Sequence, residues 1–231
     1  MDSLVSVIMS AYNAEESLGS SIESILNQTY ENLEILIMDD GSSDSTYQIC
    51  QHYEKEHSKI KTYKNLKNIG LTKSLNILIN HSQGKLIARQ DADDISNIER
   101  IEKQIDYLES NNLDACTTRA MIIKKNKKIP GFSHYLPTRL VIRKKNPFIH
   151  GTLLIKKSVI DKVGLYDERF YFAQDYKLFS DLIKVGFKIK TINECLYYLN
   201  IENNISSNYS DAQSYYAECV RADTLPDSKL D

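Results

Sequence analysis

The chain has 231 residues, 26% charged and 42% hydrophobic, with 29 basic against 31 acidic side chains. This length favours one domain with a buried core, and the near-neutral charge argues against a nucleic-acid partner. No apolar run approaches the ~20 residues that cross a membrane, and the N-terminus lacks the basic region of a signal peptide. Four separated cysteines without a CxxC pair indicate free thiols in a reducing, cytoplasmic compartment.

Strand and helix signals alternate through the first half of the chain. Strand-type apolar runs lie at residues 5–9, 33–38, 60–63 and 85–89. Helical spacing of apolar residues, as in Leu18, Ile22 and Ile25, separates these runs, and Gly84 is expected to end the third helix. This order predicts an α/β, Rossmann-like fold with a mainly parallel central sheet and helices on both faces.

The second half is less regular. Helices are expected over residues 97–110 and 175–185, and strands over 115–124, 152–155 and 188–192. A loop with a short helix covers 130–147, and a polar tail follows residue 200.

Polar side chains follow three strands of the predicted sheet. They are Ser10 and Tyr12 after the first strand, Asp39 and Asp40 after the second, and Asp91, Asp93 and Asp94 after the fourth. Because ligands of such sheets bind outside the carboxyl ends of the strands, this convergence predicts one acidic site.

The segment Asp91-Ala92-Asp93-Asp94 carries the strongest chemical signal. Two carboxylates flanking a small residue can share a divalent cation, and such oxygen ligands suit Mn²⁺ or Mg²⁺ holding a diphosphate. The alternative is a turn whose acids cap the next helix. Acidic groups at a neighbouring strand end favour the cation site.

Other candidates have a functional and a structural interpretation. Asp40 can accept a hydrogen bond from an imide such as that of uracil, or can belong to a capping turn. Tyr12 can stack on a base and Ser10 can bond it, although Tyr12 also fits a partly buried loop aromatic. Lys73, near a helix start, can meet a phosphate or be a solvated surface lysine.

Several segments together resemble family 2 glycosyltransferases, which have the GT-A fold. They are VSVIMSAYN (5–13), SIESILNQTY (21–30), EILIMDDGSSD (34–44), NIGLTKSLN (68–76), DADD (91–94), NPFIHGT (146–152) and VGLYDERF (163–170) with Gln174-Asp175. The match keeps the family's order and spacing and covers roughly residues 4 to 195.

The resemblance implies an inverting, metal-dependent glycosyltransferase (hexosyl or N-acetylhexosaminyl) that uses a nucleotide sugar, UDP-linked. Its acceptor would be a hydroxyl of a saccharide or lipid-linked molecule in polysaccharide biosynthesis. Asp93 would bind the metal and Asp175 would be the catalytic base, although the usual Glu-Asp pair is here Gln174-Asp175. The residues expected to bind the nucleotide sugar are Ser10, Tyr12, Asp40, Lys73, Asp91, Ala92 and His150. For His150 a structural role beside Gly151 is equally expected.

We expect one GT-A domain over residues 1–200, with a nucleotide-sugar-binding half (1–96), an acceptor-side half (97–200) and a tail (201–231). The expected location is the cytoplasm, including the inner face of the cell membrane. Tyrosines of the tail, among them Tyr198 and Tyr209, suit a membrane or protein contact, but a helix packed on the domain is preferred. The sequence does not indicate an oligomeric state.

Two alternatives stay open. Many family members carry Arg or His where this chain has Leu199 and Ile201, near the segment 203–206, so a degenerate member that binds nucleotide without catalysis is one. A sugar-phosphate nucleotidyltransferase is less favoured, because the segment Ser10–Asn13 lacks the Gly and Lys of the usual phosphate loop.

Overall fold

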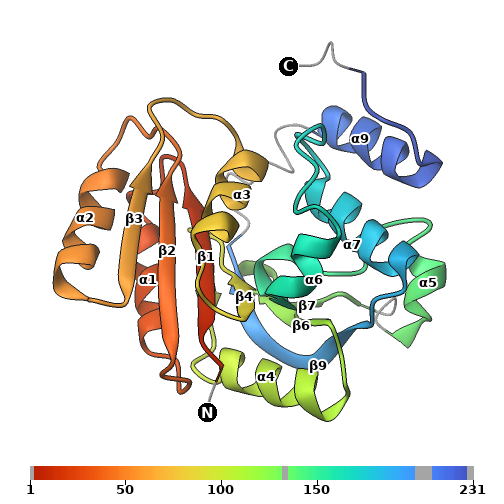
Figure 1. Ribbon diagram of the computed structural model, residues 1–231, viewed down its shortest axis with the longest axis horizontal. Coiled ribbons are helices and arrows are strands. Elements are labelled where there is room, and N and C mark those ends of the chain that lie inside the picture. Colours follow the sequence, from red (N-terminus) through yellow and green to blue (C-terminus); the bar gives the residue numbers. More distant parts are fainter. Residues whose placement is uncertain (1–2, 132–134, 201–209, 228–231) are drawn as a thin grey trace.

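The computed structural model describes residues 3–131, 135–200 and 210–227. Its strands are β1 (Val5–Ala11), β2 (Leu33–Asp39), β3 (Ile60–Lys64), β4 (Leu86–Arg89), β5 (Ile95–Ser96), β6 (Ala115–Ile122), β7 (Lys127–Ile129), β8 (Leu154–Lys156) and β9 (Ile189–Leu199). Its helices are α1 (Leu18–Leu26), α2 (Thr46–Glu56), α3 (Leu71–His81), α4 (Arg100–Ser110), α5 (Thr138–Val141), α6 (Lys157–Lys162), α7 (Gln174–Val185) and α9 (Ser210–Ala222). Two 3₁₀ turns, η1 (Ile123–Lys125) and η3 (His150–Thr152), are also present. Figure 1 shows how the helices and strands are arranged.

The strands form one sheet in the order β3-β2-β1-β4-β8-β6-β9-β5, with β7 paired to β6. Strands β1 to β4 are parallel, as the alternation of strands and helices predicts. Strand β8 is antiparallel to both of its neighbours, β4 and β6, whereas β6 and β9 are parallel. The fold is therefore the expected α/β sheet, parallel in its first half and mixed in its second.

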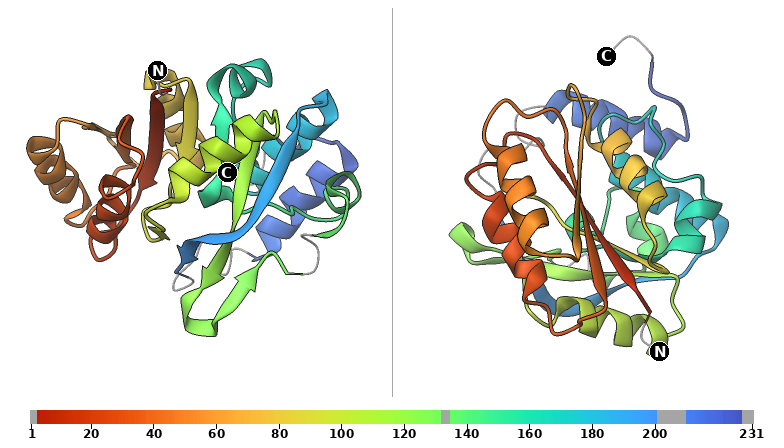
Figure 2. Two further views of the ribbon diagram at one scale, coloured as in Figure 1. Left: turned by 90° about the horizontal axis from the view of Figure 1, so that it is seen from below. Right: turned by 60° about the vertical axis from the view of Figure 1, so that its left-hand side comes forward.

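Alternating side chains of the central strands divide the core into two layers. Val7 and Met9 of β1 pack with α1, α2 and α4, whereas Ile8 packs with α3, α6 and α7. Helices accordingly cover both faces of the sheet (Figure 2). This arrangement explains the continuous apolar runs, because a parallel strand is buried on both sides.

Several boundaries differ from the sequence-based expectation. Helix α3 ends at His81, and Gly84 is instead required by close packing, since a Cβ there would lie 2.7 Å from the Leu4 carbonyl oxygen. Helix α4 begins at Arg100, because a turn over residues 97–99 follows the end of β5 at Ser96. Strand β9 runs to Leu199, as pairing with β6 and β5 extends it beyond its apolar run.

The tail contains α9, which packs against α7 through the buried Tyr216, Cys219 and Val220. This is the helical arrangement preferred from the sequence. Ile201, residues 203–206 and Tyr209 lie outside the described residues. All four cysteines are free, as expected. In the described parts of the chain, no helix is both long and apolar enough to span a bilayer.

Candidate active site

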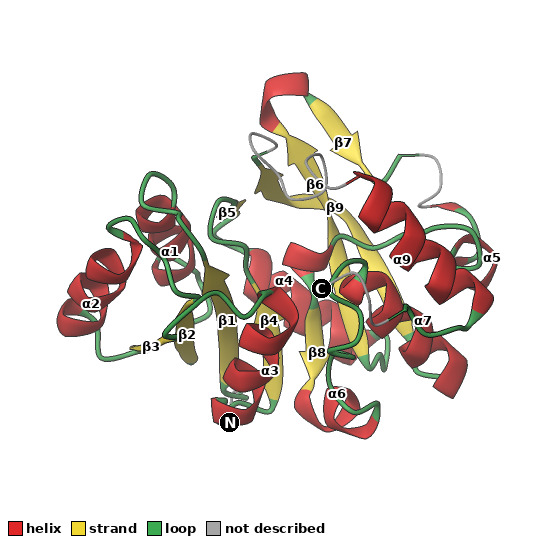
Figure 3. Cartoon of the chain, turned by 90° about the horizontal axis from the view of Figure 1, so that it is seen from above, coloured by secondary structure: helices red, strands yellow, loops and turns green. Residues whose placement is uncertain are grey.

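The carboxyl ends of β1, β2 and β4 meet at one edge of the sheet, which Figure 3 shows from above. Ala11 pairs with Asp39, and the amide of Asp40 donates a 2.8 Å hydrogen bond to the carbonyl of Ala11. The amide of Gln90 donates to the carbonyl of Ile8 at 3.2 Å. The three polar segments predicted from the sequence are therefore neighbours.

Asp40 joins the end of β2 to the loop before α3. Its Oδ1 accepts hydrogen bonds from Asn65 Nδ2 (2.7 Å) and the Ile69 amide (3.0 Å), and its Oδ2 accepts from the Gly70 amide (2.9 Å). A carboxylate oxygen has two acceptor positions, so Oδ2 retains one. Asp40 thus has a structural role and the capacity to accept one further donor.

Asp39 is fully buried, and only one of its oxygens is satisfied. Oδ1 accepts from the Ser42 amide at 3.2 Å, whereas Oδ2 has no hydrogen-bond partner among the described residues. Lys64 Nζ lies 4.0 Å from Oδ2. Asp39 therefore closes the turn that the sequence suggested, with part of its charge balanced by Lys64.

The acidic loop after β4 is held by a buried arginine. Arg89 Nη2 pairs with Asp91 Oδ1 at 2.5 Å, although only 1% of the Arg89 side chain is exposed. Arg100, also buried, donates to the carbonyls of Arg89 and Gly151 at 3.1 and 3.3 Å. The hydroxyl of Tyr197 accepts a 3.0 Å hydrogen bond from the Asp91 amide. These contacts fix the backbone that presents the acids.

Helix α1 supports the same loop from the other side. Ser21 Oγ donates to the Asp91 carbonyl at 2.7 Å, and Ser17 Oγ donates to the Ala92 carbonyl at 3.1 Å. Gly151 leaves room for the loop, because a Cβ there would lie 2.5 Å from Asp91 Oδ2. Ala92 itself is buried, so it acts through its backbone.

The acids of this loop destabilise one another's ionised forms. Burial, and then the charge of Asp91, raise the pKa of Asp93 to about 6. Burial and the charges of Asp91 and Asp93 raise the pKa of Asp94 to about 8. A divalent cation would relieve this repulsion, and carboxylates are suitable hard ligands.

The donor set fits a cation that is shared with a ligand. Within residues 3–131, 135–200 and 210–227, no group of three His, Cys, Asp or Glu side chains is placed to hold a metal. Mg²⁺ sites with one or two carboxylates commonly complete their shell with water and substrate phosphates. Asp91 and Asp93 suit this second type of site.

His150 bonds to a tyrosine on the neighbouring loop. Its Nε2 lies 2.7 Å from Tyr166 Oη. Burial, followed by the positive charge of Arg89, lowers the pKa of His150 to about 3. The imidazole is therefore neutral at physiological pH and offers a phosphate no positive charge, which favours its structural interpretation.

Asp175 stands in the first turn of α7. Asn146 Nδ2 donates a 2.7 Å hydrogen bond to its Oδ2, and Asn146 Oδ1 in turn accepts from the Phe148 amide at 3.0 Å. Burial raises the pKa of Asp175, and the negative charge of Asp91 raises it further. The fold therefore brings Asp175 into the electrostatic field of the acidic loop, which is far away in sequence.

The remaining predicted residues lie at the edge of this site. Tyr12 is 52% exposed just beyond β1, and Ser10 is half-buried near the end of that strand. Lys73 is exposed in the first turn of α3. Within the described chain, no hydrogen bond or ion pair joins Lys73 to the acidic loop.

Arg89, Arg100, Tyr197 and Asn146 were missed by sequence reasoning. A signal existed for Arg89, because an arginine inside an apolar strand next to acids is almost always paired when buried. Arg100, Tyr197 and Asn146 come from distant segments, and no local pattern marks them.

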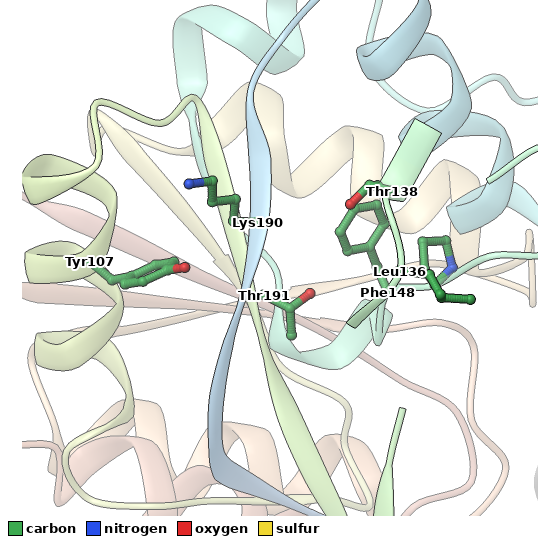
Figure 4. A pocket seen from close by; sticks show the side chains of 7 residues that line it. Tyr107, Leu136, Thr138, Phe148, Lys190 and Thr191 are labelled. Carbon is green, nitrogen blue, oxygen red and sulfur yellow. The ribbon is translucent and has the colours of Figure 1, made fainter. Parts of the chain in front are cut away.

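A small cavity lies between α4, β9 and the segment around α5 (Figure 4). It has a volume of about 180 Å³ and is lined by Tyr107, Leu136, Thr138, Pro147, Phe148, Lys190 and Thr191. This volume is below the range of roughly 300–1,000 Å³ for ligand pockets, and none of the predicted site residues lines it.

A model of the family described as "Glycosyl transferase family 2" matches residues 6–166. The chain belongs to glycosyl transferase family 2. It is 35% identical over 198 residues to the putative glycosyltransferase EpsE of Bacillus subtilis (strain 168), covering 84% of this chain and 71% of EpsE. It is also 35% identical over 214 residues to the UDP-Glc:alpha-D-GlcNAc-diphosphoundecaprenol beta-1,3-glucosyltransferase WfgD of Escherichia coli, covering 90% of this chain and 81% of WfgD.

Solved structures of other proteins have folds similar to that of this chain. The mannosyltransferase PcManGT from Pyrobaculum calidifontis, in complex with GDP-Man and Mn²⁺, matches with a TM-score of 0.76 at 15% identity, over 98% of this chain and 66% of that one. Staphylococcus aureus TarS 1-349 in complex with UDP matches with a TM-score of 0.75 at 18% identity, over 94% of this chain and 65% of that one. These likenesses confirm the GT-A fold, and family membership makes the chain a glycosyltransferase.

Proposed function

We propose that this family 2 glycosyltransferase moves a sugar from a UDP-sugar to a hydroxyl of a saccharide or lipid-linked acceptor in polysaccharide biosynthesis, with inversion at C1. The observation that carries the proposal is the acidic loop at the carboxyl ends of β1, β2 and β4, where Arg89 and Tyr197 hold Asp91 beside Asp93. The relative WfgD is named for a UDP-glucose donor and a diphosphoundecaprenol acceptor, which supports this choice of substrates.

Asp93, together with Asp91, is proposed to hold Mn²⁺ or Mg²⁺ with the diphosphate of the donor. When bound, the cation would neutralise the negative charge that develops on the departing UDP. Arg89 keeps Asp91 in place through their 2.5 Å ion pair.

Asp175 is proposed as the general base. Its carboxylate takes the proton of the acceptor hydroxyl while the acceptor oxygen bonds to C1 and the bond from C1 to the phosphate oxygen breaks, releasing UDP. Burial raises the pKa of Asp175 and so strengthens it as a base, and Asn146 orients the carboxylate. General-base assistance of this kind contributes about 10²–10⁴ in rate.

The nucleoside is proposed to lie over the ends of β1 and β2. Asp40 Oδ2 has one acceptor position for the uracil imide, and the exposed ring of Tyr12 is available for stacking. Ser10, half-buried near the end of β1, is proposed to hydrogen-bond the base. Lys73, exposed in the first turn of α3, is proposed to contact the donor phosphates.

Calorimetric titration with UDP and with GDP tests the donor site, with Mn²⁺ present and then removed by EDTA. We expect UDP to bind only with the cation, and Asp93→Ala to abolish binding. Asp106→Ala, which removes an exposed acid on α4, is the matched control and should bind normally. Absence of nucleotide binding under every metal condition would refute the donor site, and a preference for GDP would correct the base.

Hydrolysis of the donor separates an active enzyme from a degenerate nucleotide-binding member. Leu199, where basic residues are common in the family, is the last residue of β9 and pairs with Ile122. A chain that binds UDP but releases none from UDP-sugars would support the degenerate alternative.

A further inference from the structure

Basic and acidic residues are unevenly distributed along the chain. Between Ala115 and Ile160 there are eleven basic residues and no acidic one, whereas the rest of the chain has 18 basic and 31 acidic residues. The formal charge of −2 therefore combines a segment of +11 with a remainder of −13. Such a segment is attracted to an anionic surface, even though the whole protein is nearly neutral.

Around α5, basic side chains of this segment lie next to exposed aliphatic side chains. Leu140 is 61% exposed and Leu136 is 45% exposed. The α5 patch, as we define it, consists of Leu136, Arg139, Leu140, Arg143, Lys144 and Lys145. All four of its basic side chains are exposed, and in the described parts of the chain none has an acidic partner within 4.0 Å.

The composition of the α5 patch favours a lipid surface over a nucleic acid. Nucleic acids are bound by cations together with several aromatic rings on which successive bases stack, whereas a single exposed ring of the described residues, Tyr135, adjoins this patch. Exposed leucines among cations are typical of segments that lie in a membrane interface, with apolar side chains at the acyl boundary and cations at the headgroups. Helix α5 also lies at the margin of the molecule, far from the β1–β3 half (Figure 1), where a flat surface can reach it.

Hydrogen bonds connect the segment that carries the α5 patch to α7, the helix that carries the proposed base. Tyr176 Oη donates a 2.5 Å hydrogen bond to the carbonyl of the buried Ile142, which precedes the patch residue Arg143. Asn146, next to Lys145, donates to Asp175 at 2.7 Å. These two hydrogen bonds connect the segment that carries the patch to α7 and Asp175. A surface bound by the patch therefore lies near the acceptor side of the site.

We propose that the α5 patch docks this glycosyltransferase on a bilayer that carries anionic headgroups. Leu136 and Leu140 enter the interface, while Arg139, Arg143 and Lys144 contact headgroup phosphates. Docking itself does not depend on the proposed reaction, but together with it this arrangement brings Asp175 to an acceptor anchored in the same bilayer.

Vesicle sedimentation with the full chain tests the proposal, in the absence of donor and acceptor. The probes are vesicles of phosphatidylcholine alone and of phosphatidylcholine mixed with phosphatidylglycerol in equal parts. We expect binding only to the mixed vesicles, weakened by salt. Each basic residue near an anionic surface contributes about fivefold to partitioning, so Arg139→Gln/Arg143→Gln/Lys144→Gln should weaken binding about 100-fold.

Two further variants separate charge, insertion and position. Leu136→Ser/Leu140→Ser should weaken vesicle binding at least about tenfold while leaving the net charge unchanged. Lys55→Gln/Lys61→Gln/Lys85→Gln, which removes three exposed lysines of the first half, is the matched control and should bind like the parent chain.

Three results would overturn the proposal. They are no binding of the parent chain to the mixed vesicles, equal loss in the control triple, and tighter binding to random-sequence single-stranded RNA that is insensitive to the leucine changes. UDP titration of the same variants reports the donor site separately, so a failure of docking is distinguishable from a failure of the proposed function.

Discussion

Asn146→Ala offers the sharpest test of Asp175 as the base. The side chain of Asn146 donates a 2.7 Å hydrogen bond to Asp175 and so stabilises the ionised carboxylate, against the burial that raises the pKa of Asp175. A hydrogen bond to a charged group contributes roughly 1.5–3 kcal/mol. Its loss raises the pKa of Asp175 further and lowers the ratio of ionised to protonated carboxyl roughly 10- to 100-fold.

The assay is release of UDP from UDP-glucose or UDP-N-acetylglucosamine with Mn²⁺, measured from acid to alkaline pH. Only the ionised carboxylate can accept the proton, so the rate falls as pH drops, and the variant should fall at higher pH than the parent. Both should converge in rate at alkaline pH, where Asp175 is ionised in each. Asn111→Ala, which removes an exposed side chain bonded to the Tyr107 carbonyl, is the control and should keep the parent profile.

A ratio of the two rates that is the same at every pH would refute this reasoning, since Asn146 would then only position neighbouring groups. Asp175→Asn should lower the rate about 10²–10⁴-fold with UDP binding unchanged. If that variant retains nearly the full rate, the base is a different residue.

Two predictions concern the support of the acidic loop. Arg89→Met leaves the partly exposed Asp91 without its 2.5 Å partner, and we expect the free energy of unfolding in urea to fall by roughly 1–3 kcal/mol. A fall of less than about 1 kcal/mol would show that the Arg89–Asp91 ion pair contributes no more to the free energy of unfolding than an exposed surface pair does. Gly151→Ala places a Cβ 2.5 Å from Asp91 Oδ2 and should weaken Mn²⁺-dependent UDP binding at least about tenfold, a loss of roughly 1.4 kcal/mol. Gly131→Ala, where a Cβ meets nothing within 4 Å, should bind UDP normally, and equal affinities of the two variants would contradict the role of Gly151.

The parallel half of the fold could be predicted from local pattern. Strands β1 and β2 are buried along nearly their whole length, and their apolar runs show this directly. Helix α1 is buried on one face, and the spacing of Leu18, Ile22 and Ile25 shows that face. The acids after β4 could be assigned to a strand end for the same reason. After β4 the boundaries differ from the prediction, because β5, β7 and the end of β9 form through pairing with other strands rather than through their own periodicity.

The sequence by itself therefore determined the family, the order of the main elements and the residues Asp93 and Asp175 as candidates. Tertiary structure decided what holds them: the burial of Arg89 beside Asp91, the hydroxyl of Tyr197 on the Asp91 amide, and the amide of Asn146 on Asp175. These partners lie on other strands and loops. A residue that is needed only for a long-range contact produces no periodic pattern in the sequence around it. Burial and neighbouring charge then set each pKa, because both depend on which segments the fold brings together.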